Sequence, residues 1–168
     1  MEKITLPIYL IGMPGSGKSA VARHLSQTLD LPIIDLDHEI EKHAHMFIEE
    51  IFETYGESVF REKETQLLRS FSRDKAVIAC GGGIVLNPEH KKIMQKGTII
   101  YITVDVNIIE ERLKHSTHRP ILKTKSIQQL YDERMFKYLD FADVTISNER
   151  DINQTIDDIK EFLKGSLT

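Results

Sequence analysis

The stretch of sequence that most constrains the fold runs from Gly12 to Ser19 and reads Gly-Met-Pro-Gly-Ser-Gly-Lys-Ser. It matches G-x-x-x-x-G-K-[ST], the pattern of a phosphate-binding loop, here called the P-loop. Its glycines let the backbone curl so that N–H groups face phosphate oxygens. Lys18 would reach the β- and γ-phosphates of a nucleotide, and the Ser19 hydroxyl would ligate Mg²⁺. The motif predicts a nucleoside triphosphate site without saying what the phosphate is used for.

Segments of strand and helix character alternate on both sides of this loop. Ile8 to Ile11 form a short apolar run typical of a buried strand, and Val21, Leu25 and Leu29 recur at helical spacing within 19–29. Further strands are predicted at 32–34, 76–79, 99–104 and 144–146, and further helices at 39–55, 58–71, 88–95, 108–114 and 152–163. The alternation predicts a three-layer α/β/α fold around a five-stranded parallel sheet, with ligands beyond the carboxyl ends of the strands.

Length and composition limit the function classes. The 168 residues fit a single domain over 1–168, and a net charge of −4 argues against a broad nucleic-acid surface. No apolar run approaches the length of a membrane span, and the first residues lack the pattern of a signal peptide. The single cysteine, Cys80, cannot form an intrachain disulfide, which suits a cytoplasmic protein; we expect it to be a small buried residue.

Two carboxylates follow the second predicted strand. Residues two apart in a strand face the same way, so Asp35 and Asp37 would both lie near the P-loop if the strand geometry continues. One could accept the proton of an acceptor hydroxyl or orient it, and another could hold Mg²⁺ through water. The alternative is that the pair caps the next helix.

Two further features have both a functional and a structural interpretation. Arg61 and Glu64 are three residues apart and could pair on one helical face, either in a site or as a surface salt bridge. Gly81, Gly82 and Gly83 end a predicted strand, where they could admit a ligand close to the backbone or form a flexible turn.

The polar segment 115–125 fits neither helix nor strand and contains Arg119, Lys123 and Lys125. A loop of this length inside a compact domain is typical of a functional element. We expect a mobile lid here, with a solvated surface loop as the alternative.

The order of these motifs resembles that of the shikimate kinases, a branch of the P-loop kinases with a nucleoside-monophosphate-kinase-like fold. The resemblance runs from about residue 8 to 146. It rests on the P-loop, Asp35-x-Asp37, Glu50-Ile51-Phe52 before Gly56-Glu57, Phe60-Arg61-x-x-Glu64, Gly81-Gly82-Gly83, Arg119-Pro120, and Arg134 with Tyr138 and Ala142.

The resemblance implies ATP-dependent phosphorylation of the 3-hydroxyl of shikimate in the pathway to chorismate and the aromatic amino acids. It implies catalytic roles for Lys18, Asp37 and Arg119, and one Mg²⁺ held by Ser19 and, through water, by Asp35. Arg112 would stack on adenine, with an exposed helix arginine as the alternative. The implied ATP contacts are Gly12, Gly15, Ser16, Gly17, Lys18, Ser19, Ala20, Arg112 and Arg119.

The resemblance also implies an acceptor-binding region at about 37–64 and further contacts downstream. Arg61 and Arg134 would grip the carboxylate of shikimate, since guanidinium groups bind carboxylates in a planar, bidentate way. Glu64 would orient Arg61. The implied shikimate contacts are Asp37, Phe52, Phe60, Arg61, Glu64, Gly81, Gly82, Gly83 and Arg134.

The sequence departs from the family pattern at Ala20, Cys80, His45-Met46 and Phe136, and it has no proline near 148–151. We expect these departures to alter fit and affinity, not the type of reaction. We expect ATP and shikimate as partners, no nucleic acid or membrane, and a monomer. The alternatives are another small-molecule kinase of this fold, acting on gluconate or a nucleotide, and a non-catalytic nucleotide-binding switch.

Overall fold

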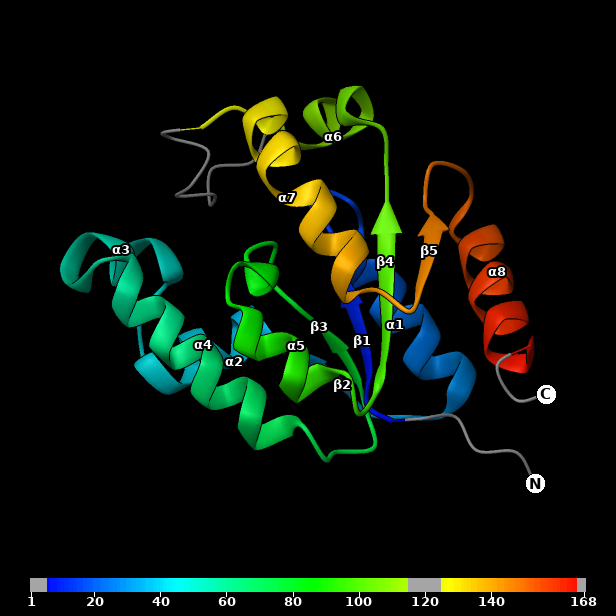
Figure 1. The fold of residues 1–168 in the computed structure, drawn as a ribbon, viewed down its shortest axis with the longest axis horizontal. Helices are drawn as coiled ribbons and strands as arrows, with labels where there is room; N and C mark the ends of the chain where they lie inside the picture. The colour runs from blue at the N-terminus through cyan, green and yellow to red at the C-terminus, as the bar shows by residue number, and fades with distance from the viewer. Residues whose placement is uncertain (1–5, 115–124, 166–168) are drawn as a thin grey trace.

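Five parallel strands form the central sheet in the computed structural model, which describes residues 6–114 and 125–165 (Figure 1). The strands are β1 (Ile8–Ile11), β2 (Ile33–Asp35), β3 (Val77–Ala79), β4 (Thr98–Thr103) and β5 (Val144–Ser147). The helices are α1 (Lys18–Leu29), α2 (Leu36–Ala44), α3 (Ile48–Tyr55), α4 (Glu57–Phe71), α5 (Pro88–Met94), α6 (Val106–Leu113), α7 (Ile127–Phe141) and α8 (Ile152–Gly165), with a 3₁₀ turn η1 (Ile84–Leu86).

The strand order is β2-β3-β1-β4-β5, so the strand that leads into the P-loop lies at the centre of the sheet. In register, Leu10 of β1 lies beside Ala79 of β3 on one side and Ile100 of β4 on the other. Because all strands are parallel, their carboxyl ends share one edge. The segments that follow β1, β2 and β3 therefore converge there.

Alternate side chains of each strand enter two separate cores, one on each face of the sheet. Ile8 and Leu10 of β1 pack with α1 and α8, whereas Tyr9 and Ile11 pack with the helices of the other face, among them α4 and α7. All four of these residues are fully buried. Helices thus cover both faces, and the predicted α/β/α fold with a five-stranded parallel sheet is confirmed.

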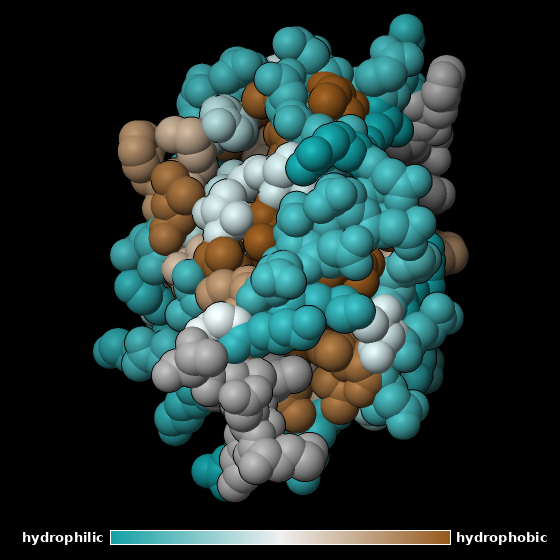
Figure 2. Space-filling view, turned by 90° about the vertical axis from the view of Figure 1, so that its right-hand side faces the viewer, coloured by the Kyte–Doolittle hydropathy of each residue, from teal (hydrophilic) through white to brown (hydrophobic). Residues whose placement is uncertain are grey.

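Helix α8 covers part of one face of the sheet. Its buried residues Ile156, Ile159 and Leu163 recur at helical spacing and pack against the sheet. The side of the molecule that carries α8 is mainly hydrophilic, and hydrophobic side chains appear there in small groups (Figure 2). The helix therefore uses a single apolar stripe to cover the sheet.

The structure corrects the helix predicted at 39–55. Two helices occupy this stretch because His45 adopts a left-handed conformation, with φ of 55°, and ends α2. Carboxylates then support the start of α3: Glu41 accepts a hydrogen bond from the Ile48 N–H, and Glu50 accepts one from Phe47. The first of these helices also begins earlier than predicted, at Leu36.

Candidate active site

The P-loop joins the carboxyl end of β1 to the first turn of α1. Gly15 and Gly17 have φ of +82° and +89°, a left-handed region that glycine enters at little cost. Gly17 is the N-cap of α1, so the positive end of that helix faces the loop. The ammonium of Lys18 lies 2.7 Å from the Gly12 carbonyl oxygen and 2.9 Å from that of Met13. The loop thus combines backbone N–H groups, a helix N-terminus and a cation.

A cavity of about 650 Å³ opens beside this loop at the carboxyl edge of the sheet. P-loop and α1 residues form one wall, and residues after β2 and β3 form another. Its lining includes Gly15, Gly17, Lys18, Ser19, Ala20, Asp35, Asp37, Gly81, Gly82 and Arg112. The structure therefore brings together most of the phosphate-side residues that the sequence predicted.

Asp35 ends β2 and has two contacts. One carboxylate oxygen accepts a hydrogen bond from the His38 N–H at 3.2 Å and caps α2, as the alternative interpretation had it. The other accepts one from the Ser19 hydroxyl at 3.3 Å. Asp37 lies in the first turn of α2, so the assumption of continued strand geometry was wrong, although both carboxylates line the cavity. The hydroxyl and carboxylate oxygens of Ser19 and Asp35 are the kind of ligands that Mg²⁺ prefers, so this pair fits the expected ion.

The three glycines after β3 each face a different charged side chain. A Cβ on Gly81 would lie 2.6 Å from Asp37 Oδ1, and one on Gly82 would lie 3.2 Å from Arg134 Nη1. A Cβ on Gly83 would collide with the guanidinium of Arg61. A Cβ at any of these three positions would have to displace a neighbouring side chain, and the segment links three predicted site residues that come from α2, α7 and α4.

Arg61 is held by two carboxylates of its own helix. Its Nη1 lies 3.2 Å from Glu64 Oε1, and its Nη2 lies 3.3 Å from Glu57 Oε2. The Glu64 side chain is fully buried, so this is not the surface salt bridge that the spacing also allowed. Burial raises the pKa of Glu64 to about 7, although the positive charge of Arg61 lowers it. The sequence did not single out the contact with Glu57.

Arg134 is almost fully buried, and its Nε has no hydrogen-bond partner among the described residues. One helical turn along α7, the Tyr138 hydroxyl donates to the Gly82 carbonyl at 2.6 Å. Burial raises the pKa of Tyr138 well above its usual range, even though Arg134 lowers it, so the phenol remains protonated as a donor. A buried cation next to the glycine segment is suited to pairing with an anionic ligand.

The aromatic pair Phe52 and Phe60 lies beside Arg61. Their ring centroids are 5.1 Å apart, and the Arg61 guanidinium carbon is 4.9 Å from the centre of the Phe60 ring. Phe60 is a buried core residue, whereas Phe52 is partly exposed. Cys80 is buried, and burial raises the pKa of its thiol, as expected for a packing residue.

The remaining predicted site residues either do not line the cavity or lie outside the described residues. Arg61 and Arg134 adjoin the glycine segment without lining the 650 Å³ cavity. The other described site residues that do not line it are Gly12, Ser16, Phe52, Phe60, Glu64 and Gly83. Arg119 and nearly all of the expected lid, residues 115–124, lie outside the described residues.

Arg112, an expected ATP contact, lines the cavity and is an exposed helix residue, as its alternative interpretation predicted. The sequence did not predict its contacts with the P-loop carbonyls. Its Nη1 donates to the carbonyls of Gly15 and Ser16, and its Nη2 donates to the carbonyl of Asn148. Asn148 was also missed as a site residue. No local pattern in the sequence could have indicated it, because its partner Ser16 lies 132 positions away.

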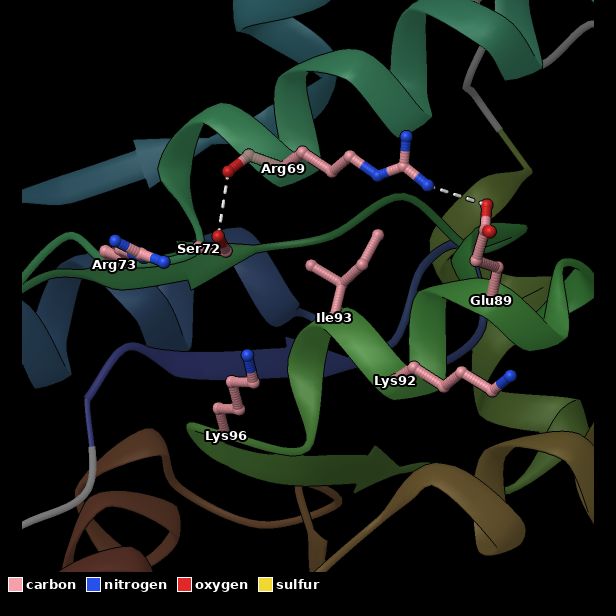
Figure 3. A pocket seen from close by; sticks show the side chains of 7 residues that line it. All are labelled: Arg69, Ser72, Arg73, Glu89, Lys92, Ile93 and Lys96. Carbon is pink, nitrogen blue, oxygen red and sulfur yellow. Dashed lines mark hydrogen bonds and ion pairs between the residues drawn. The ribbon is translucent and has the colours of Figure 1, made fainter.

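A second cavity, of about 330 Å³, lies at the C-terminal ends of α4 and α5 (Figure 3). Four cations line it, and one of them, Arg69, pairs with Glu89 at 2.8 Å. Basic side chains here offset the negative ends of the two helices. The cavity also lies at the amino edge of the sheet, away from the edge where open α/β sheets bind ligands, so we assign it no ligand.

Two kinds of feature are absent from the part of the chain that the structure describes. In residues 6–114 and 125–165, no helix is long and apolar enough to cross a membrane. Within the same ranges, no three His, Cys, Asp or Glu side chains gather in a way that could hold a metal ion by themselves. A metal held by one hydroxyl, one carboxylate and the ligand's own phosphates would not require such a group.

Comparison with known proteins gives consistent matches. The family model described as shikimate kinase matches residues 14–164. A shikimate kinase of Rippkaea orientalis is 41% identical over 143 residues, which is 83% of this chain and 76% of that protein. One of Bacillus cereus is 35% identical over 158 residues, or 92% and 96%. The solved structure "Shikimate kinase from Acinetobacter baumannii in complex with shikimate" has a TM-score of 0.90 at 32% identity, covering 98% of this chain and 97% of that one.

Proposed function

The chain belongs to the shikimate kinase family, and from this premise we infer that it transfers the γ-phosphoryl group of ATP to shikimate. The products are shikimate 3-phosphate and ADP. In the transfer, the 3-hydroxyl oxygen bonds to the γ-phosphorus as the bond to the β,γ-bridging oxygen breaks. The enzyme thus serves the pathway to chorismate and the aromatic amino acids.

The observation that carries the acceptor assignment is the glycine segment with its three charged neighbours. Gly81, Gly82 and Gly83 face Asp37, Arg134 and Arg61 in turn. A carboxylate suits a ring hydroxyl, and two guanidinium groups suit a carboxylic acid. Shikimate has both kinds of group, so this arrangement supports binding of its acid end by the arginines and of its hydroxyls by Asp37. Glu64 would orient Arg61, and Phe52 with Phe60 would form an apolar wall.

On the phosphate side, we propose that Lys18 contacts the β- and γ-phosphates while the P-loop amides bind them. Ser19 would ligate Mg²⁺ directly, and Asp35, 3.3 Å from the Ser19 hydroxyl, would hold it through water. When bound, the ion would neutralise charge on the phosphates. Asp37 lines the same cavity and would accept the proton of the attacking hydroxyl.

Further proposals rest on the sequence and on its resemblance to the family. Arg119 would balance charge on the transferring group, and residues 115–125 would exclude water as a lid. We also propose a cytoplasmic monomer. The single cysteine, buried as a free thiol, is consistent with a reducing compartment.

The deciding measurement of the reaction is ADP release at matched Mg²⁺ with and without shikimate. We expect strong stimulation by shikimate and none by gluconate or a nucleoside monophosphate. Stimulation by gluconate alone would favour the other small-molecule kinase, and nucleotide affinity without any stimulation would favour the switch. No observation on this chain favours either alternative.

The carboxylate clamp has a sharper test in shikimate methyl ester, which keeps the hydroxyls but loses the negative charge. Wild-type protein should prefer shikimate to the ester, and Arg134→Ala should raise the KM for shikimate about tenfold or more while reducing that preference. The control is Arg150→Ala, because Arg150 is an exposed arginine beyond β5. Unchanged discrimination in the Arg134 variant would rule out the clamp.

A further inference from the structure

Asn148 is buried directly behind the P-loop, one residue beyond the end of β5. Its Nδ2 donates to the Ser16 carbonyl at 2.8 Å, and its Oδ1 accepts from the Thr155 hydroxyl of α8 at 2.7 Å. The Asn148 side chain therefore has a fixed orientation, because a carbonyl can only accept and must face the amide nitrogen. Its backbone N–H donates to the Thr103 carbonyl at the end of β4. The residue thus connects the P-loop to β4 and α8.

The Ser16 carbonyl receives a second donor from another element. Arg112 Nη1 lies 3.2 Å from this oxygen and Nη2 lies 3.1 Å from the Asn148 carbonyl. Ser16 is almost completely buried, so water cannot replace these donors. An unpaired buried carbonyl is costly, and the loop therefore gains stability when its carbonyl points toward Asn148.

The direction of this carbonyl fixes the direction of the next amide. A peptide unit is planar and trans, so the Gly17 N–H points to the side opposite the Ser16 oxygen, away from Asn148. Gly17 lines the cavity, whereas the preceding amide, Ser16 N–H, is bound to the Met13 carbonyl within the loop. A Cβ on Gly17 would also lie 2.5 Å from Asn148 Nδ2, so the two residues pack without spare room.

We propose that Asn148, oriented by Thr155, is a positioning residue that aims the Gly17 N–H at a phosphate oxygen of the bound nucleotide. The inference rests on the proposed function only in taking ATP and ADP as ligands of the P-loop. It adds a link from the end of the sheet and from α8 to the phosphates. Asn148 itself would not touch the phosphates.

The test compares Asn148→Leu, which keeps much of the side-chain volume without either hydrogen bond, with Thr155→Val, which frees the amide to turn. Calorimetry with Mg²⁺-ADP should show about tenfold weaker binding for Asn148→Leu, the scale of one lost hydrogen bond in a fixed site. Thr155→Val should weaken ADP binding by a few fold. Thr155→Ser keeps the hydroxyl and should bind ADP like the wild-type protein. The shikimate affinity should not change in any of them. Asn153→Leu, an exposed position on α8, is the matched control.

A second readout separates positioning from mere stability. On ADP binding, the amide proton resonance of Gly17 should shift in wild-type protein and shift less in both test variants. If the variants only lower the melting temperature and still bind ADP like wild type, the proposal is overturned. If Asn148→Leu does not fold, Thr155→Val decides by the same criteria. Absence of ADP binding to wild-type protein would instead refute the proposed function.

Discussion

Glu64 is buried beside Arg61, and its protonation should make the free energy of unfolding depend on pH. Because burial raises its pKa from 4.5 to about 7, the folded chain holds a proton in this window that the unfolded chain has released. The contribution of Glu64 to the free energy of unfolding should therefore fall as pH rises from about 4.5 to 7, by an amount on the order of 3 kcal/mol.

Urea unfolding at several pH values measures this dependence. Glu64→Gln should remove most of the slope between pH 4.5 and 7, since an amide does not titrate. Glu62→Gln is the control, because Glu62 is exposed on the same helix. A slope that survives in Glu64→Gln would show that another group releases the proton.

Tyr138 supports the glycine segment through one hydrogen bond, from its hydroxyl to the Gly82 carbonyl. Tyr138→Phe leaves that partly buried carbonyl without this donor, so we expect a loss of about 1 kcal/mol in the free energy of unfolding. Because the segment adjoins Arg134, the KM for shikimate should rise more than the KM for ATP.

The matched control is Tyr101→Phe, which removes a hydroxyl from the ring stacked on Tyr138 and leaves the bond to Gly82 in place. Equal effects of the two substitutions on the KM for shikimate would mean that the Tyr138–Gly82 bond does not position the segment.

At the scale of elements, the turn after β3 depends on having no side chains. Gly83→Ala would push the Arg61 guanidinium away, and that guanidinium is the flexible end of a long side chain. We therefore expect a small change in melting temperature together with a fall of about tenfold to 100-fold in kcat/KM for shikimate, as for a misplaced binding group. Gly165→Ala, at the end of α8 with open space around it, should change neither quantity. A Gly83→Ala enzyme with normal kinetics would remove Arg61 from the site.

Other elements show where local sequence falls short. Strands β1 and β4 could be predicted because they are short, apolar and β-branched, and α1 because its apolar residues recur at helical spacing. The break between α2 and α3 at His45 could not be predicted, because neither glycine nor proline occurs there. Of α7 (Ile127–Phe141), only the part around Arg134 was recognised as helical from the sequence.

For the whole molecule, stability should depend on the two cores that share the sheet. Ile100 lies in β4, fully buried in the core with α1 and α8, so Ile100→Ala should cost about 2–5 kcal/mol. Ile33 on the edge strand β2 is 40% exposed, and Ile33→Ala should cost under about 1 kcal/mol. Thermal and urea unfolding would measure both. Similar losses for the two variants would contradict this distribution of burial.

The P-loop and the alternation of strands and helices followed from the sequence, because each depends on neighbours within a few positions. The roles expected of the charged site residues came instead from the resemblance of the motif order to a family. Tertiary structure decided which of these residues meet. Asp37, Arg61 and Arg134 come from three helices far apart in the chain, and they converge because parallel strands place their following segments at one edge. The contacts of Asn148 and Arg112 with the Ser16 carbonyl were equally beyond local sequence, since they join residues 132 and 96 positions apart. Such contacts depend on how the sheet and its helices pack.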